Sequence, residues 1–588
     1  MLVFGKMTRP RDPRDLLSDI EHLVAEAARA PADIRRHGAL VAAFIEAGVL
    51  LQGLADADFA AQGCDANSPQ QEAATALLLT LGGAVDNSWR DGFRREIPDL
   101  ERDLAAFTAL PLPAEVATRW PEGFSYYALY PEAYAVAARR AGLGLGTHVI
   151  GLRSIGAPLA AMVAAGLGSD RLTTVRPIGH PFGRTLSVSE DTGARLHETG
   201  AAIAVVDEGP GLSGSSFGGT LDALQDLGVP EPRITLFPSH DDPPGPKASD
   251  AHRARWGRIP RHLVSFDELM LHPERPEHAI GAWFVDLVGG AEGPLETISG
   301  GEWRRHLYLD EAAWPPVNAW QERRKFLLRA RGRTWRLKFA GLGAGAARKA
   351  ERAGILSEAG FTPVYLGLRH GFLLEHWHAD AQPLAADRAE NTRWIDTLGR
   401  YLGFRARHFP ATGNAGAHLD ELLAMARHNV GEALGQDWVR PLDIWTPDAV
   451  AALGAVVRPV ETDNRMQPWK WLSLPDGRLL KSDALDHHAG HDLVGCQDIA
   501  WDIVGAVQEF AFEAAAQARL TAVVEETCER RIDPRLIAFL TPCYLAFQVG
   551  ALILALEATS DAAERQRLKV WRDRQTARLC RSLDGARA

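Results

Sequence analysis

Two adjacent carboxylates, Asp207 and Glu208, end a short apolar run in the segment AAIAVVDEGPGLSGSSFGGTLDAL, residues 201–224. A loop made almost entirely of glycine, proline and serine follows the acids, and a helical pattern follows the loop. Small loop residues can close around a phosphate, and the unpaired N–H groups at a helix N-terminus favour an anion. Acids at the end of a strand can accept the hydroxyl groups of a ribose. The segment therefore predicts a site for a phosphorylated sugar.

The same segment resembles the PRPP-binding motif of the type I phosphoribosyltransferases, in which an apolar strand, two acids and a short turn precede T/S-G-x-T/S. The resemblance implies that Asp207 and Glu208 are catalytic residues that hold the ribose hydroxyls, and that the loop binds the 5′-phosphate. One extra residue in GPGL leaves the loop register open, and a strand–helix turn of another α/β protein is the alternative. A nucleophile elbow, G-x-S-x-G, is excluded because serine replaces its second glycine. The matching loop residues are Ser213, Gly214, Ser215 and Ser216.

Basic and hydroxyl side chains upstream of this motif occur in the order that the same family shows. HVIGLRSIGAPL places Arg153 and Ser154 between two glycines and resembles the family's pyrophosphate loop. VRPIGHPFGR, with Arg176, His180 and Arg184, falls where the family carries a flexible hood over the substrate. Cations that face a leaving pyrophosphate would stabilise its developing charge. The resemblance implies PRPP as a substrate and Mg²⁺ as a cofactor.

A second group of charged residues matches the needs of phosphoryl transfer. That reaction needs a cation on the ATP phosphates, a carboxylate that positions the attacking hydroxyl, and a carboxylate that holds Mg²⁺. RKFLLRARGRTWRLKFAG predicts a β-hairpin with Lys338 on its second strand. Glu351, in the helical pattern that follows, is the predicted partner of this lysine at the ATP site, with Glu358 as the alternative.

The downstream stretch from Val460 resembles the aminoglycoside phosphotransferase and choline kinase-like group, which carries H-G-D-x-x-x-x-N, a hairpin, and then an acid. The resemblance implies ATP as a substrate, Asp463 as the catalytic residue and Asp483 as the Mg²⁺ ligand. The closing element QDIAWDIVGA supplies Asp498 and Asp502.

The same stretch departs from the family pattern at several positions. Glu461 and Thr462 replace the usual His-Gly, and Pro468 stands where the metal-binding asparagine is expected. Gln467 is the nearest amide and is therefore the predicted second metal ligand. A kinase-like domain that binds nucleotide without transferring phosphate, and an unrelated helical domain, stay open as alternatives.

Clustered histidines in DHHAGHD, residues 486–492, have the spacing of metal ligands, with His487 and His491 four residues apart. Because the cluster follows Asp483 directly, we expect it to line the same phosphate and metal site, or to cap a helix, rather than to bind zinc. EHWH, residues 375–378, is expected near the hinge between two lobes, as an adenine contact or as a packed aromatic.

Three regions with different hydrophobic patterns indicate the elements that position these residues. A helical N-terminal region is expected at 1–118, and a parallel-sheet phosphoribosyltransferase-like domain at 119–288. A loose segment then leads into 304–588, where a strand-rich lobe precedes a helical lobe, the order of a bilobal protein-kinase-like domain. The predicted fold class is thus multidomain, combining α/β and α+β parts.

Size and composition fit a soluble multidomain protein. The chain has 588 residues, 46% hydrophobic and 24% charged, with a net charge of −11 and no dense basic cluster, so no nucleic-acid partner is expected. Five scattered cysteines and the lack of an apolar leader favour the cytoplasm. The apolar stretch 536–556 predicts a buried helix pair rather than a membrane span, because it contains Pro542 and Gln548.

Together these patterns predict a bifunctional enzyme that acts on small molecules. One half would transfer a phosphoribosyl group from PRPP and the other would phosphorylate a hydroxyl with ATP, in the synthesis of a phosphoribosylated or nucleoside-like metabolite. A regulatory protein that senses PRPP or nucleotide with a degenerate kinase half is one alternative. An antibiotic-modifying kinase is another, and homo-oligomerisation stays open.

Overall fold

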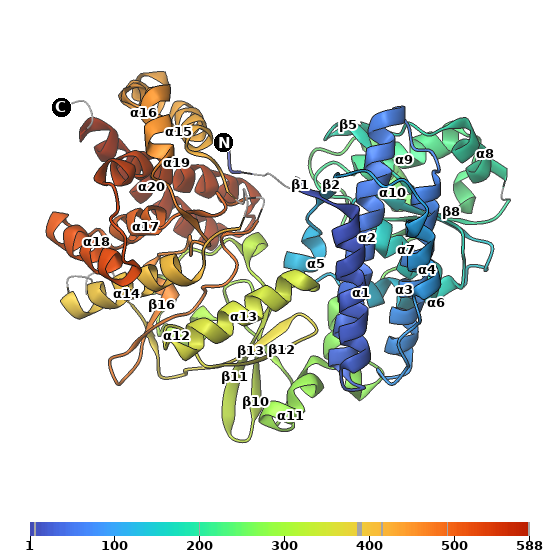
Figure 1. Cartoon of the computed structure of the whole chain (residues 1–588), viewed down its shortest axis with the longest axis horizontal. Helices are drawn as coiled ribbons and strands as arrows, with labels where there is room; N and C mark the ends of the chain where they lie inside the picture. Colours follow the sequence, from blue (N-terminus) through green and yellow to red (C-terminus); the bar gives the residue numbers. More distant parts are fainter. Residues whose placement is uncertain (5–7, 199, 385–390, 413–415, 491, 586–588) are drawn as a thin grey trace.

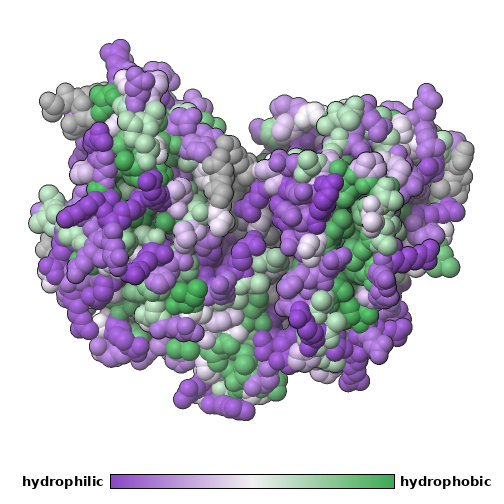
Figure 2. Space-filling model, in the orientation of Figure 1, coloured by the Kyte–Doolittle hydropathy of each residue, from purple (hydrophilic) through white to green (hydrophobic). Residues whose placement is uncertain are grey.

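The computed structural model of the chain describes residues 1–4, 8–198, 200–384, 391–412, 416–490 and 492–585. The N-terminal helices and a parallel sheet form one half, and the C-terminal helices form the other (Figure 1). An antiparallel sheet with its helix lies between them along the chain and at the bottom of the view. On the face shown in Figure 2, a notch separates the halves at the top, and they are joined below it.

The predicted helical N-terminal region is present. Its first three helices begin where Asp12, Asp33 and Ser68 accept hydrogen bonds from backbone N–H groups of the first turn, which is the expected role of these residue types. Strands from the two ends of this region pair antiparallel. The elements are β1 (Thr8–Arg11), α1 (Pro13–Arg29), α2 (Ile34–Gln62), α3 (Pro69–Arg90), α4 (Glu101–Thr108) and β2 (Val116–Arg119).

The predicted parallel sheet is also present, in the order β4-β3-β7-β8. The chain moves from β3 to β4 on one side and later returns to place β7 on the other side of β3. Ligands of open α/β sheets bind at the carboxyl ends of the strands where the order reverses in this way. The strands are β3 (His148–Leu152), β4 (Leu172–Val175), β7 (Ile203–Val206) and β8 (Ile234–Phe237).

Helices and a small hairpin surround this sheet. The hairpin β5–β6 occupies the position predicted for a hood. The elements are α5 (Glu122–Tyr126), α6 (Pro131–Arg140), α7 (Gly156–Leu167), β5 (Ile178–His180), β6 (Gly183–Thr185), α8 (Glu190–Glu198), α9 (Ser215–Asp226), α10 (Asp250–Arg258) and α11 (Val285–Val288).

The predicted hairpin around Lys338 is confirmed and belongs to an antiparallel sheet of order β12-β13-β11-β10-β9. Its turn uses Arg331 and Gly332, both with positive φ. Helix α13 connects β11 to β12. The elements are β9 (Glu296–Thr297), α12 (Arg304–Leu307), β10 (Lys325–Ala330), β11 (Arg333–Phe339), α13 (Ala344–Glu358), β12 (Tyr365–Arg369) and β13 (Phe372–His376).

A helical lobe with short strands completes the chain, in the predicted order of sheet lobe and then helical lobe. The predicted kinase-like acids Asp463 and Asp483 follow two of its short strands, β15 and β17. The elements are β14 (Gln382–Pro383), α14 (Thr392–His408), α15 (Leu419–Leu434), α16 (Pro447–Gly454), β15 (Pro459–Val460), β16 (Trp471–Ser473), β17 (Leu479–Lys481), β18 (Gln497–Asp498), α17 (Ala500–Phe510), α18 (Ala514–Cys528), α19 (Pro534–Ala558) and α20 (Ala562–Gly585).

The apolar stretch 536–556 forms one continuous helix, α19, so the predicted helix pair is wrong. Pro542 lies inside it without ending it, in a part of the helix that is buried. Among the described residues, α2 and α19 are long and apolar enough to cross a membrane. In the most apolar windows of these helices, 78% and 67% of the residues are buried within the protein.

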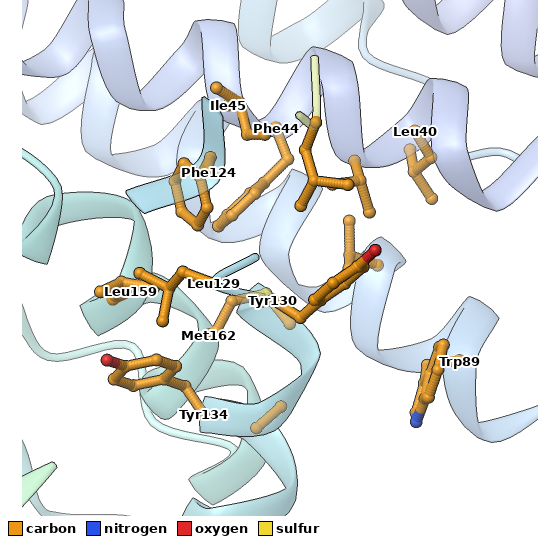
Figure 3. Packing of buried hydrophobic residues seen from close by; sticks show 14 of the residues in the cluster. Leu40, Phe44, Ile45, Trp89, Phe124, Leu129, Tyr130, Tyr134, Leu159 and Met162 are labelled. Atoms are coloured by element: carbon orange, nitrogen blue, oxygen red, sulfur yellow. The ribbon is translucent and has the colours of Figure 1, made fainter. Parts of the chain in front are cut away.

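One hydrophobic cluster joins the N-terminal helices, the parallel sheet and the antiparallel sheet. Phe44 of α2, Phe124 of α5, Leu159 of α7 and Phe339 of β11 all belong to it. Figure 3 shows Phe44 and Phe124 packed beside Leu129 and Leu159. The N-terminal helices therefore share their core with the sheets, and the predicted boundaries at 118 and 288 stay predictions.

Candidate functional site

A cleft between the antiparallel sheet and the helical lobe gathers most of the predicted kinase-like residues. It encloses about 130 Å³. Lysines of the antiparallel sheet and of the helical lobe lie close to the acids Asp483 and Asp486, which follow β17. The polar residues that line it include Lys325, Lys338, Arg465, Gln467, Lys470, Asp483 and His487.

Lys338 and Asp483 meet in this cleft, although 145 positions separate them in the chain. Lys338 Nζ lies 2.5 Å from Asp483 Oδ1, and Lys470 Nζ lies 2.8 Å from Asp483 Oδ2. These ammonium groups outweigh the cost of burial and hold the pKa of Asp483 well below its ordinary value. The carboxylate is therefore ionised and its charge is balanced by lysines.

The predicted pair between Lys338 and Glu351 is wrong. Glu351 lies on the exposed side of α13, as does the alternative Glu358. On the inner side of α13, Lys349 lies 3.8 Å from Asp486 and donates a hydrogen bond to the Ala340 carbonyl. Positions two apart on a helix point to different sides, so Lys349 and Glu351 cannot both face the cleft.

Asp483, Asp486 and His487 place their ligand atoms within 4.8 Å of one another. Asp486 Oδ1 and Gln467 Oε1 are buried and accept no hydrogen bond from the described residues. Carboxylate and amide oxygens are ligands that Mg²⁺ accepts, so these residues fit a divalent cation. The predicted ligands Asp483 and Gln467 thus line one cavity, and Asp486 is a candidate that sequence reasoning placed nearby without a role. His491 lies outside the described residues.

Asp463, predicted as the catalytic carboxylate, does not line this cavity. Its side chain is fully buried, with Lys481 Nζ 3.2 Å from Oδ1 and the Tyr401 hydroxyl donating to Oδ2. The backbone N–H groups of Asp463 and Asn464 donate to the Asp502 carboxylate at 2.6 and 2.8 Å. In this geometry Asp463 and Asp502 anchor a loop, and Asp463 is not placed to contact an acceptor hydroxyl.

A segment of the chain itself, residues 298–323, lines one side of the cleft, and we call it the strap. Trp303 packs in one apolar cluster with Leu327 and Trp377, the latter from the stretch predicted near the hinge. Its indole N–H donates to Glu322 Oε1 at 2.9 Å, and the same oxygen lies 3.1 Å from Lys325 Nζ. The strap therefore occupies the apolar end of the cleft and neutralises one of its lysines.

Ion pairs and hydrogen bonds hold the strap against the C-terminal helix α20. Arg304 lies 2.8 Å from Glu564, whose other carboxylate oxygen accepts the Val317 N–H at 2.6 Å. At the C-terminal end of the strap, Arg323 lies 3.3 Å from Asp486. The strap is thus fixed to the helical lobe and to the candidate metal acids.

The second candidate site lies at the carboxyl edge of the parallel sheet, directly after β7. Burial raises the pKa of Asp207 to about 7, and burial together with Asp207 raises the pKa of Glu208 to about 8. Within the described part of the chain, no ion pair reaches either carboxylate. These acids stand beside β3, at the point where the strand order reverses. Their place fits the predicted ribose-binding role, which stays a prediction.

The serine loop after these acids touches the predicted hood. The hydroxyl groups of Ser213 and Ser215 donate to the Pro181 carbonyl at 3.0 and 2.7 Å. Gly214 has a φ of +63°, which favours glycine, and Ser215 and Ser216 open the first turn of α9. The hood and the loop are therefore in direct contact, and two of the loop hydroxyls are engaged in hydrogen bonds to the hood.

The basic residues predicted for pyrophosphate are paired with acids of the N-terminal helical region. Arg153 Nε lies 3.0 Å from Asp56 and Arg176 Nε lies 2.8 Å from the same carboxylate. The Asp65 carboxylate accepts hydrogen bonds from the Arg153 guanidinium and from the backbone N–H of Arg176. These cations are therefore not free for an anion, which corrects the prediction for this arrangement of the chain.

The remaining residues predicted for PRPP bond locally. Arg184 donates to the Pro177 carbonyl at 3.0 Å, within the hood. Ser154 lies in the turn between β3 and α7, and its peptide bond to Arg153 is cis. The part of these residues in binding stays a prediction.

A further buried cluster joins the N-terminal half to the antiparallel sheet, and sequence reasoning did not identify it. Glu132 Oε1 lies 2.7 Å from His37 Nε2 and 2.8 Å from His370 Nε2, with all three side chains fully buried. These are hydrogen-bond distances to one shared oxygen. The cluster is therefore a hydrogen-bonded bridge between α2, α6 and the β12–β13 turn, and its three side chains are also of the types that bind metal ions.

Comparison with known proteins finds kinases and phosphotransferases. No family model and no curated protein matches the chain. It is similar to choline kinase LicA of Streptococcus pneumoniae in complex with AMP, with a TM-score of 0.33, 13% identity, and coverage of 51% of this chain and 97% of that one. It is also similar to a choline/ethanolamine kinase family protein of Mesorhizobium loti, with a TM-score of 0.32, 17% identity, and coverage of 51% and 94%.

A third similar structure is spectinomycin phosphotransferase APH(9)-Ia in complex with ADP and spectinomycin, with a TM-score of 0.31 and 8% identity. It covers 50% of this chain and 94% of that one. These similarities each involve about half of the chain and concern kinases and phosphotransferases, so the predicted phosphoribosyltransferase-like domain stays a prediction.

Proposed function

We propose that the cleft is the site of an ATP-dependent phosphotransferase that acts on a hydroxyl of a small molecule. The observation that carries the proposal is the meeting of Lys338 and Asp483, one from each lobe. A lysine for the phosphates facing a carboxylate for the metal is the arrangement that phosphoryl transfer requires.

Each group around this pair has a part in the proposal. Lys325, Lys338 and Lys470 would bind and orient the phosphates, since lysine binds phosphate as a point charge. Asp483, Asp486 and Gln467 would hold Mg²⁺, which when bound neutralises charge on the transferring phosphoryl group. The activation of the acceptor hydroxyl is left without a residue, because Asp463 is engaged by Lys481.

Nucleotide entry requires the strap from Trp303 to Glu322 to leave the cleft, while Arg323 stays beside Asp486. Glu322 would release Lys325, and Trp303 would leave its contact with Trp377. Lys338 would turn from Asp483 to a phosphate, and the freed carboxylate would bind the metal. Closure by the strap would exclude water when the cleft is not in use.

The test is a calorimetric titration of the full chain with AMP-PNP and Mg²⁺, compared with Asp483→Asn. We expect the wild type to bind in the micromolar range and the variant to lose at least tenfold in affinity. A matched control is Asp476→Asn in the β16–β17 turn, where the carboxylate is exposed and pairs with Arg478. The proposal would be refuted if the wild type did not bind AMP-PNP, or if Asp483→Asn bound it with the same affinity as the wild type.

Turnover separates an enzyme from a nucleotide sensor. Formation of ADP with a panel of amino alcohols, aminoglycosides and nucleosides is the expected result for a phosphotransferase. Nucleotide binding without ADP formation on any acceptor would instead favour the regulatory alternative.

We further propose that the sheet edge binds a phosphorylated ribose such as PRPP, which would make the protein bifunctional. What supports this is a pair of acids without ion-pair partners in the described residues, directly before a glycine loop and the N-terminus of α9. Titration with PRPP and Mg²⁺ is the test, with Asp207→Asn expected to weaken binding at least tenfold. The control is Asp191→Asn, an exposed acid of α8. Unchanged binding by Asp207→Asn would overturn the ribose role.

A further inference from the structure

Helix α5 lies between the two candidate sites and is bonded to the segment that follows Lys338. The Leu342 N–H donates to the Phe124 carbonyl at 2.9 Å. At Gly341, with a φ of +108°, a Cβ atom would lie 2.8 Å from the Ser125 carbonyl oxygen, so only glycine permits this approach. The β11–α13 connection is thus held against α5 by a close backbone contact.

Tyr126, the last residue of α5, contacts the segment that follows Asp486. Its hydroxyl donates to the Ala489 carbonyl at 2.8 Å, three residues after Asp486. The Arg323 guanidinium lies 4.4 Å from the centre of its ring, and Lys349 Nζ lies 5.3 Å from the same point. Cations above an aromatic face are attracted by its quadrupole.

The cations that Tyr126 contacts also lie beside Asp486, whose charge they balance together with Lys338. Arg323 Nε lies 3.3 Å and Lys349 Nζ 3.8 Å from Asp486 Oδ2. Both therefore approach one oxygen of this carboxylate, while Oδ1 is buried without a hydrogen-bond partner and lies 3.7 Å from Lys338 Nζ. Tyr126 therefore contacts cations on the Oδ2 side of Asp486, while Oδ1 is on the side of Lys338 and His487, both of which line the cleft.

We propose that Tyr126 is a positioning residue of the phosphotransfer site: it sets Asp486 and the loop up to Ala489 so that Oδ1 is available to a metal. This inference rests on the proposed function of the cleft. Tyr126 comes from the half of the chain that carries the parallel sheet, so the phosphotransfer site would be completed by a residue from outside the kinase-like part. Truncation to the kinase-like residues would then leave Asp486 unsupported.

The test measures the affinity of the full chain for AMP-PNP with Mn²⁺ and without metal, in Tyr126→Leu and Tyr126→Phe. Leucine removes both the ring and the hydroxyl, and we expect it to weaken the Mn²⁺-dependent affinity about tenfold while the metal-free affinity changes less than twofold. Phenylalanine keeps the ring over Arg323 and Lys349, and we expect it to restore most of the loss. The control is Tyr127→Leu, whose side chain is 45% exposed.

The outcomes separate this inference from the function on which it rests. A wild type that binds nucleotide, with a Tyr126→Leu variant whose Mn²⁺-dependent affinity is unchanged, would overturn the positioning role alone. Equal losses with and without metal, together with a lowered Tm, would assign Tyr126 a structural role only and also overturn the inference. A wild type that binds no nucleotide would remove the phosphotransferase proposal and this one with it.

Discussion

The acids of the cleft and the acids of the sheet edge are buried to similar degrees but differ in their charge balance. Asp483 has lysines at 2.5 and 2.8 Å, and its pKa is held well below its ordinary value. Asp207 has no ion-pair partner among the described residues, and burial raises its pKa to about 7. The cleft is therefore neutralised by the protein itself, whereas the sheet edge is left for a ligand to neutralise.

This difference indicates what each site needs before it can act. A ligand of the cleft must exchange its own charges for existing ion pairs and must displace the strap. A ligand of the sheet edge has no pair to break at Asp207 and Glu208, and hydroxyl groups or a cation there would satisfy carboxylates that burial now penalises.

Asp483→Asn should lower the free energy of unfolding by about 3–5 kcal/mol, because it removes the nearest counter-charge of the buried Lys338 and Lys470. Denaturant unfolding of the full chain measures the change. In Asp476→Asn, loss of the exposed pair with Arg478 should leave the free energy of unfolding nearly unchanged. If both variants unfold alike, the cleft carboxylate is not balanced in the way described.

Glu132→Gln should lower the free energy of unfolding by about 2 kcal/mol, because one carboxylate oxygen accepts from two buried histidines. The pKa of Glu132 is held below its ordinary 4.5 by these histidines, so the stabilisation is present above that pH and is lost as the pH falls below it. Glu274→Gln is the control, since Glu274 is exposed. A loss that stays the same from pH 7 to pH 3 would contradict the role of the charge.

Trp303→Ala should raise the affinity of the cleft for AMP-PNP with Mg²⁺ about tenfold, a gain of about 1.4 kcal/mol, because the indole fills the apolar end of the cleft. Calorimetric titration measures it. Leu309→Ala lies in the same strap with its side chain in solvent and should leave the affinity unchanged. A lower affinity in Trp303→Ala would mean that the strap supports the nucleotide instead of excluding it.

Local patterns predicted the elements, and a family pattern predicted which distant residues meet. The hairpin around Lys338 and the helix after it follow from alternation and period, and the meeting with Asp483 follows from the resemblance. Periodicity could also have corrected the choice of Glu351. Ala346, Lys349, Ala353 and Leu356 of α13 are buried and recur at helical spacing, which places Lys349 on the inner face.

Other features could not be predicted because they depend on pairs that no local pattern joins. Arg153 and Asp56 are 97 positions apart, and nothing near either residue indicates that an acid of α2 would neutralise a predicted anion-binding arginine. The strap is a comparable case, because its sequence is that of a linker and its role depends on what lies beneath it. The burial of Asp463 depends on Lys481 and Tyr401, which surround it only in the folded chain.

The most direct test of the comparison is the stability of Asp207→Asn against wild type as a function of pH. The folded state holds the Asp207 proton up to about pH 7 and the unfolded state only up to its ordinary 3.8, so wild-type stability falls as the pH rises between these values. We therefore predict a Tm of Asp207→Asn equal to that of wild type only at pH values well below 3.8, and higher than that of wild type by several degrees at pH 8. A variant less stable than wild type at pH 8 would show that this carboxylate is already balanced by the protein, and would contradict the account.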